Sequence, residues 1–239
     1  VGVFTFMRVG TGKTRSRFEF GTMKKELAEI KDKLGLLKRL DKRFQIVGAN
    51  QHHYYSYVPD EVEVEVFEKA IDIKLPNTFR DFLREIGYGA GPYDGLWTLE
   101  QIRDEQNYLQ LEALRANRSI SPNKPFPLDD EKQARKVAEA WQDWKQTPSS
   151  LYVQSPANGC IPLHGSGTDS KSWIFLVPAG TMTGSIWHGS SRSDWLPASR
   201  PLGTLSQKAV LPLVKAPLQF HEWYLSWLEQ AIADINYPA

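Results

Sequence analysis

The sequence predicts an α+β fold, in which a single domain has a mixed or antiparallel sheet flanked by helices. Three observations support this prediction. In the first half of the chain, apolar residues recur at three- and four-residue spacing, which indicates helices. From residue 159, short apolar runs alternate with Gly, Ser and Pro, which indicates strands and turns. The last segment is amphipathic again and predicts a closing helix.

The composition is that of an ordinary globular protein and excludes several other classes. Of 239 residues, 41% are hydrophobic and 24% are charged. Eight Trp, nine Tyr and eleven Phe are too much apolar surface for a chain disordered throughout. The one cysteine, Cys160, excludes a disulfide scaffold and a thiolate zinc cluster. The apolar stretch 173–180 is far shorter than the roughly 20 residues of a membrane-spanning helix, and residues 1–8 lack signal-peptide features, so we expect a cytoplasmic protein.

Charge is unevenly distributed along the chain. Residues 1–45 carry 12 basic and 5 acidic residues, a net charge of +7, whereas residues 46–239 carry a net charge of −6. The basic residues of 23–45 alternate with acidic ones at helical spacing, as in Glu29 and Lys33, which is typical of a solvated helix face. The acidic remainder favours a basic protein partner and argues against direct binding of nucleic acid.

The first predicted helix also sets the domain boundaries. From Leu27 to Phe44 the apolar residues form one stripe, which predicts a helix over residues 23–44. We therefore expect three parts: residues 1–22 as an arm that is either flexible or not native to the protein, residues 23–58 as the N-terminal helix and a connector, and residues 59–239 as the α+β domain.

Residues 60–75 fit two structures, of which we favour the helix. Alternating valines would suit a strand, but Val62, Val66 and Ala70 share one helix face, and Asp60 is a good N-cap. Pro76 opens the next predicted helix, which a run of glycines ends. A short strand over 95–99, a helix over 100–116, a proline-containing loop over 117–128 and a helix from Asp129 through Trp144 follow.

The remaining elements are short strands and a helix. The predicted strands are 160–163, 173–177, 185–188 and 210–214, and the closing helix spans 217–235. Gly180 and Gly184 predict a hairpin between two of these strands, and Trp187 is expected to pack in the core.

Three features suggest chemistry, but each favours a structural role. Residues 10–14 resemble the end of a phosphate-binding loop, yet Met7 stands where the first glycine is needed. Cys160 could act as a nucleophile with His164 or His188 as base, but a lone cysteine in an apolar run is more often a small core residue. The five histidines lack metal-ligand spacing. The sequence therefore predicts no catalytic residue, no metal and no cofactor, and an enzyme that uses Cys160 stays as an alternative.

Four segments, in this order, resemble one known family. They are FEKAIDIKLPNTFRDFLREIGYGAGPYDGLWTL at 67–99, PFPL at 125–128, GCIPLHGSGTDSKSWIFLVPAGTMTGSIWH at 159–188 and FHEWYLSWLEQAI at 220–232. Over residues 60–235 the chain is similar to the SUKH superfamily, which includes yeast regulators of cell-wall synthesis and many bacterial immunity proteins. Two features depart from the family pattern. Gly165-Ser166-Gly167 stands where many members have a Gly-Cys-Gly-like turn, and residues 1–45 lie outside the match.

The resemblance implies an α+β domain that binds a protein partner without catalysis. Bacterial members neutralise toxins of interbacterial competition, many of them nucleases or other nucleic-acid-modifying enzymes. Eukaryotic members are regulatory or scaffolding modules. We therefore expect an immunity protein with a cognate toxin domain as partner, and a regulatory or scaffolding module as the alternative.

Aromatic residues beside flexible polar segments are the candidate contacts, because such side chains often anchor protein interfaces. The glycine-rich stretch 87–95 allows close backbone approach at a helix-to-strand corner. The second candidate surface is the polar run 190–194 that precedes Trp195, and the third is the polar, aromatic run 51–57. The alternative role for the aromatic residues is packing in the core or at the corner. The candidate partner-binding residues are Tyr88, Tyr93, Trp97, Asp194 and Trp195.

Overall fold

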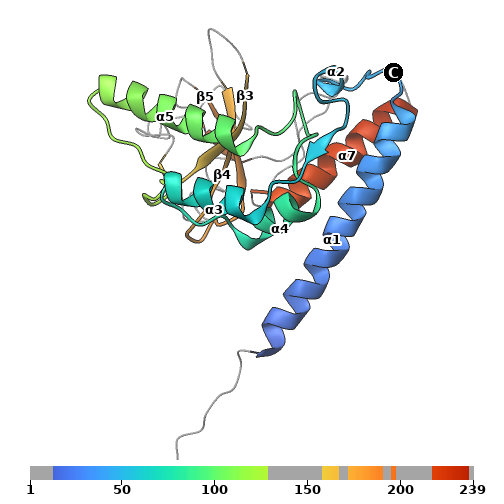
Figure 1. Ribbon diagram of the computed structural model, residues 1–239, viewed down its shortest axis with the longest axis horizontal. Coiled ribbons are helices and arrows are strands. Elements are labelled where there is room, and N and C mark those ends of the chain that lie inside the picture. Colours follow the sequence, from blue (N-terminus) through green and yellow to red (C-terminus); the bar gives the residue numbers. More distant parts are fainter. Residues whose placement is uncertain (1–12, 129–157, 167–171, 191–194, 198–216, 237–239) are drawn as a thin grey trace, which may run out of the picture.

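The chain forms the predicted α+β fold (Figure 1). The computed structural model describes residues 13–128, 158–166, 172–190, 195–197 and 217–236. In chain order the elements are α1 (Lys13–Leu40), α2 (Ala49–His52), β1 (Ser56–Tyr57), α3 (Glu61–Ala70), α4 (Asn77–Glu85), β2 (Tyr88–Gly89), α5 (Leu99–Arg115), β3 (Ile161–Ser166), β4 (Ser172–Leu176), β5 (Ile186–Ser190), β6 (Trp195–Pro197) and α7 (Phe220–Asn236).

The main sheet is antiparallel, with strand order β3-β4-β5-β6. Its side chains alternate between two apolar layers, as expected for a strand with both faces buried. In β4, Ile174 and Leu176 pack with the helices α1, α3, α4 and α7. Trp173 and Phe175 point to the opposite layer, which residues of the 120–128 segment and the end of α5 complete. The sheet therefore lies between two parts of the core.

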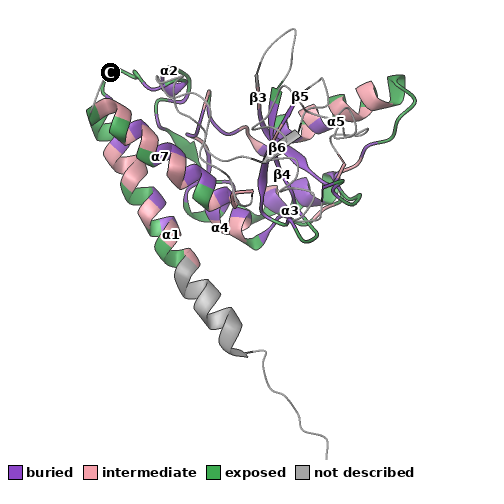
Figure 2. Ribbon diagram, turned by 180° about the vertical axis from the view of Figure 1, so that it is seen from behind, coloured by how far each residue is buried: buried purple, intermediate pink, exposed green. Residues whose placement is uncertain are grey.

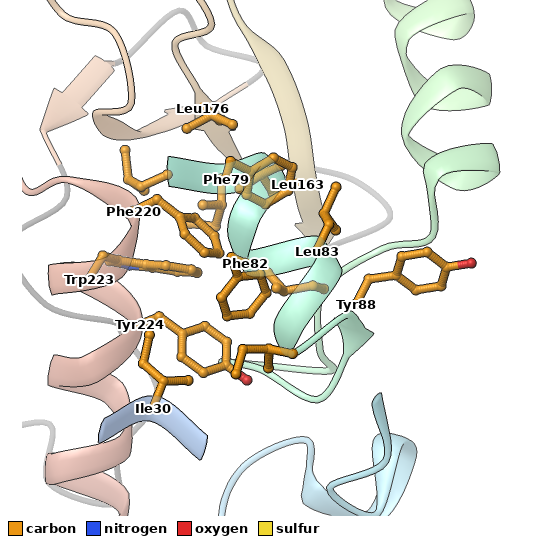
Figure 3. Packing of buried hydrophobic residues seen from close by; sticks show 14 of the residues in the cluster. Ile30, Phe79, Phe82, Leu83, Tyr88, Leu163, Leu176, Phe220, Trp223 and Tyr224 are labelled. Carbon is orange, nitrogen blue, oxygen red and sulfur yellow. The ribbon is translucent and has the colours of Figure 1, made fainter. Parts of the chain in front are cut away.

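Aromatic rings join α4 to α7 at the centre of the larger layer (Figure 3). The Phe82 ring lies 4.7 Å from Phe220 and 4.9 Å from Tyr224, both in edge-to-face arrangement. Ile30 of α1 is fully buried beside them. Edge-to-face pairs add about 0.5–1.5 kcal/mol each to the stabilisation from burial, so this cluster holds the helices together.

The helix α1 runs beside α7 on one side of the molecule (Figures 1 and 2). Its inner residues are buried, whereas the outer ones are exposed (Figure 2). Lys33 of α1 pairs with Glu229 of α7 at 2.9 Å and with Glu29 one turn earlier at 3.3 Å. This contact brings together two segments from opposite ends of the sequence.

A buried carboxylate fixes the turn that follows α1. Asp41 accepts hydrogen bonds from the backbone N–H groups of Gln45 and Ile46 and, at 2.6 Å, from the Tyr54 hydroxyl. Burial and the bond to Asp41 raise the pKa of the Tyr54 phenol. These bonds satisfy the buried charge and place the chain that leads into β1.

Most element boundaries agree with the sequence prediction. Within the segment 60–75, residues Glu61–Ala70 form the helix α3, and the Asp60 side chain accepts from the Glu63 N–H as its N-cap. The helix ends five residues earlier than expected, because a turn at 71–72 follows it. The hairpin between β4 and β5 is confirmed, with positive φ angles at Gly180 and Gly184, and Trp187 is fully buried.

One predicted helix has different ends, one predicted strand is wrong, and two predicted elements are not covered. The first helix begins at Lys13 rather than at residue 23, and it ends at Leu40. Residues 95–99 are not a strand, because Leu96 makes only an isolated bridge to Gly89 and Thr98 already caps α5. The predicted helix from Asp129 and the predicted strand 210–214 lie outside the described residues.

Candidate partner-binding site at the glycine corner

The glycine corner, residues 87–97, links the end of α4 to the start of α5. Gly87 and Gly95 have φ angles of +90° and +100°, which side chains other than glycine rarely adopt. A Cβ atom at Gly95 would lie 2.0 Å from the Gly89 carbonyl oxygen. The corner therefore folds back on itself so closely that only glycine fits there.

Backbone hydrogen bonds connect the corner to both sheets. Gly89 and Leu96 exchange N–H to carbonyl bonds of 3.1 and 2.8 Å, and Trp97 N–H donates to the Leu163 carbonyl of β3 at 2.9 Å. β2 in turn pairs with β1 in an antiparallel ladder. The pairing thus continues from β1 across the corner to the main sheet.

Two of the predicted contact residues meet at the corner around a histidine. The Tyr93 ring stacks on His164 with centroids 5.3 Å apart and planes 12° apart. The Trp97 ring centroid lies 5.8 Å from the same imidazole, and its edge lies against Gly165. Both aromatic side chains are half-buried. The corner therefore presents two aromatic residues held on a rigid support.

Residues 59–188 match the family model described as SMI1 / KNR4 family (SUKH-1), and this match covers more than half of the chain. The chain belongs to this SUKH-1 family. Comparison with the curated proteins and with the solved structures found no match. The matched part of this SUKH-1 protein contains the glycine corner, β3, β4 and His188 of β5, whereas α1 and α7 lie outside it.

Histidine side chains support the corner from inside this SUKH-1 domain. The His164 Nδ1 donates to the Gly95 carbonyl at 2.9 Å, which fixes the neutral tautomer, and burial lowers the pKa of His164. The His52 Nδ1 accepts from the Tyr54 N–H at 3.0 Å, and burial lowers the pKa of His52 to about 4. At neutral pH both rings are uncharged and serve as packing and hydrogen-bonding groups.

Tyr88 has a supporting position in the SUKH-1 domain. Its ring is buried and lies 5.2 Å from the Tyr57 ring, and its hydroxyl donates to Glu63 of α3 at 3.0 Å. Desolvation and the bond to Glu63 raise the pKa of this phenol. Tyr88 therefore ties β2 to α3, and a direct contact with a partner stays a prediction for this residue.

The other two predicted residues are not part of the corner. Asp194 lies outside the described residues. Trp195 begins β6, where its backbone pairs with Gly189, and β6 is the strand farthest from β3 in the main sheet. A partner surface that includes both Trp195 and Trp97 would therefore have to extend across this sheet.

Sequence reasoning missed the role of His164 in the corner. From the sequence, His164 is a candidate only as a base for Cys160 or as a metal ligand. One feature of the sequence could have indicated this role. His164 stands in an apolar strand and is followed by Gly165, whose missing side chain leaves room for a large ring. The pairing of His164 with Tyr93 could not be inferred, because it joins residues far apart in the sequence.

The described residues provide little support for thiol or metal chemistry. Cys160 is fully buried, and this burial raises its pKa, which opposes formation of a thiolate. Among the described residues, no three His, Cys, Asp or Glu side chains gather as a metal site. In the same part of the chain, every helix is too short or too polar to cross a membrane.

Proposed function

We propose that this SUKH-1 protein is a cytoplasmic immunity protein that binds and neutralises a cognate toxin of interbacterial competition. The preferred toxin class is a nuclease or another nucleic-acid-modifying enzyme. The protein acts by forming a stoichiometric complex and catalyses no reaction. Membership of a family of binding modules, together with the aromatic pair Tyr93 and Trp97 on the glycine corner, is the observation on which this proposal rests.

The corner suits binding because its aromatic residues are held in place before a partner arrives. The Tyr93 ring rests on His164, and the backbone of Trp97 is bonded to β3. An interface residue that is already ordered loses little conformational entropy on binding, so more of the contact energy contributes to affinity. Aromatic anchors of this kind are enriched among the residues that dominate interface energies.

Charge supports the same assignment. Residues 46–239 carry a net charge of −6, and Asp94 and Glu100 are exposed at or beside the corner. A toxin that acts on nucleic acid presents a basic surface, and opposite charges accelerate encounter and favour the correct partner. An acidic protein bound over that surface would also exclude the nucleic acid.

The alternative function is a regulatory or scaffolding module. Such a protein would also bind a partner through its surface, so the fold does not distinguish it from an immunity protein. The two differ in what the partner does to a cell, because only an immunity protein rescues growth from a toxin.

Co-expression tests the proposal directly. Toxin domains encoded beside this gene would be produced in a bacterial host with and without the protein, and rescued pairs would be tested for a complex of defined stoichiometry. Cys160→Ala is included because full rescue by this variant is expected if no thiol chemistry is involved. We expect growth rescue and a co-purifying complex, whereas failure of every neighbouring toxin to be rescued or bound would favour the regulatory module.

A further inference from the structure

The outer edge of β1 has backbone groups that the sheet leaves unpaired. Ser56 lies opposite Gly89 in the ladder. Gly89 gives both its N–H and its carbonyl to Leu96, on the side away from β1. Opposite residues of an antiparallel ladder orient these groups in opposite directions at such a position. The N–H and carbonyl of Ser56 therefore point outward, and both residues of β1 are exposed.

Exposed apolar side chains continue from this edge onto α3. They belong to residues within a twelve-residue stretch of the chain, and each exposes between 48% and 67% of its surface. Core residues expose far less of their surface than this. A single exposed hydrophobic side chain is ordinary in a folded protein, but five of them within one short stretch of sequence require an explanation. We call the group the β1–α3 strip; it consists of Tyr55, Tyr57, Val58, Val62 and Val66.

The strip has an acidic flank. Residues 55–66 contain Asp60, Glu61, Glu63 and Glu65 and no basic residue. Glu61 pairs with Arg80 and Arg84 of α4. Among the residues that the structure describes, no basic side chain pairs with Asp60, Glu63 or Glu65. At the other end, Lys38 of α1 lies 3.9 Å above the Tyr55 ring. Negative charge is therefore concentrated over α3, at one end of the strip.

We propose that an extended segment of the partner protein adds to the outer edge of β1 as a further strand. The segment carries alternating apolar and basic side chains, with the basic ones placed over the acidic flank on α3. This inference rests on the proposed function, because the segment belongs to the toxin. The outward Ser56 groups supply the main-chain hydrogen bonds, and the apolar strip with its charges supplies selectivity.

If no partner binds there, the free edge of β1 must be protected from pairing with another chain. Free strand edges in soluble proteins are usually covered, twisted away or protected by lysine or proline on the strand. Ser56 and Tyr57 of β1 include neither residue type, and aromatic side chains flank the edge instead. A second copy of this chain could pair along the same edge, so the oligomeric state must be measured together with binding.

Two probes separate this inference from the proposed function. The first is a short peptide of alternating valine and lysine, compared with its valine–glutamate counterpart. The second is any toxin domain that the co-expression experiment recovers. For both, hydrogen–deuterium exchange is followed at the Ser56 amide in the full chain, and light scattering reports the mass of the protein with and without the probe.

The main variant is Ser56→Pro. It removes the outward N–H, and because this N–H makes no bond within the ladder, an edge proline is tolerated there. Glu65→Lys is a second variant that leaves the backbone unchanged and reverses an exposed charge on α3. Ser56→Thr and Glu112→Lys, the latter at a partly exposed position on α5, are the matched controls.

We expect the lysine peptide to bind at least about tenfold more tightly than the glutamate peptide. Binding should slow exchange of the Ser56 amide, and Ser56→Pro and Glu65→Lys should each weaken it about tenfold while the controls bind normally. No difference between the peptides, or unchanged binding of both variants, would overturn the inference. A dimer of the free chain that Ser56→Pro dissociates would also overturn it.

The toxin domain distinguishes the two proposals. If a toxin binds but leaves the Ser56 amide unprotected and tolerates Ser56→Pro, the strand-addition inference fails and the immunity proposal stands. If no neighbouring toxin binds while the lysine peptide does, the immunity proposal fails and the edge remains a binding site for a basic strand.

Discussion

The Tyr93 ring lies face to face on the His164 imidazole, with centroids 5.3 Å apart and planes 12° apart. Tyr93 itself has a φ angle of +58°, an uncommon conformation for a residue with a side chain. The stack and the hydrogen bond from His164 to Gly95 together hold this conformation. The corner therefore keeps a half-buried tyrosine in one position, which is suited to an interface anchor.

Replacing Tyr93 by alanine tests this role. Loss of one aromatic pair should lower the free energy of unfolding by about 1 kcal/mol, whereas affinity for the toxin should fall roughly 30-fold, as for an interface hot spot. Denaturant titration and titration calorimetry measure the two effects. Tyr108→Ala, at an exposed position on α5, is the control and should bind normally. Equal affinity of wild type and Tyr93→Ala would remove Tyr93 from the interface.

Glycine substitutions test the close approach within the corner. In Gly95→Ala the new Cβ would meet the Gly89 oxygen at 2.0 Å and φ would be +100°, so we expect a loss of more than about 3 kcal/mol in the free energy of unfolding. Gly35→Ala on α1 is the matched change, because its Cβ would meet nothing nearer than 3.6 Å. Helix propensity predicts a gain of about 1 kcal/mol there. Thermal and urea unfolding of both variants give the comparison, and a stable Gly95→Ala would refute the strain argument.

The elements that the sequence predicted correctly share one physical property. Their apolar residues form a repeating pattern over several turns or strand positions, as in α7 or in β4. The α3 helix was predicted from the shared face of Val62, Val66 and Ala70 and from Asp60 as N-cap. The cap is confirmed, whereas Val62 and Val66 are exposed and the buried residues are Val64, Phe67 and Glu68. Strands of two residues, such as β1 and β2, are too short to show such a pattern. They form only because they pair with each other in the folded protein.

The candidate site was predictable only in part. The glycines indicated a tight corner and marked Tyr93 and Trp97 as neighbours of a turn. The stacking of Tyr93 on His164 and the outward orientation of Ser56 depend on pairing between distant segments. No local pattern encodes such contacts, so they required the structure.

A buried glutamate provides a test of the link between α3 and α4. The Glu68 side chain is 1% exposed and accepts from the Leu75 N–H at 2.9 Å and from Arg80 at 3.1 Å, and Lys74 lies at 2.7 Å. Glu68→Gln removes the charge but keeps the shape, so an amide group must face donors that it cannot fully satisfy. We expect a loss of about 3 kcal/mol in the free energy of unfolding, measured in urea.

The control for that variant is Glu112→Gln. Glu112 is partly exposed and pairs with Arg115 on the surface of α5, where an ion pair contributes little. Its free energy of unfolding should stay within about 0.5 kcal/mol of wild type. If Glu68→Gln and Glu112→Gln lowered the free energy of unfolding by the same small amount, the hydrogen bonds and ion pairs of Glu68 would not be important for stability.

The buried thiol predicts slow labelling of Cys160. It is fully buried, and burial raises its pKa, so a thiol reagent should react with it only when the protein opens. We expect less than stoichiometric labelling after hours at neutral pH and complete labelling in denaturant, measured by mass spectrometry. Rapid labelling of the folded protein would contradict the assignment of Cys160 to the core.

Acid should destabilise the protein through its buried histidines. Burial lowers the pKa of His52 to about 4 and also lowers that of His164, whereas both titrate near 6.5 when the chain is unfolded. Below pH 6.5 the unfolded state therefore binds protons that the folded state does not. For His52 the free energy of unfolding should fall by up to about 1.4 kcal/mol per pH unit as the pH decreases from about 6.5 toward 4. His164 should add to this decline below pH 6.5.

Asparagine variants isolate this contribution. Asparagine can replace the Nδ1 interaction of either ring and does not titrate in this range. His52→Asn and His164→Asn should each be less stable than wild type at pH 7 but should show a shallower decline between pH 6.5 and 4, measured by urea unfolding at each pH. An unchanged slope in both asparagine variants would mean that other groups cause the acid sensitivity, and that the two histidines do not remain neutral in the fold.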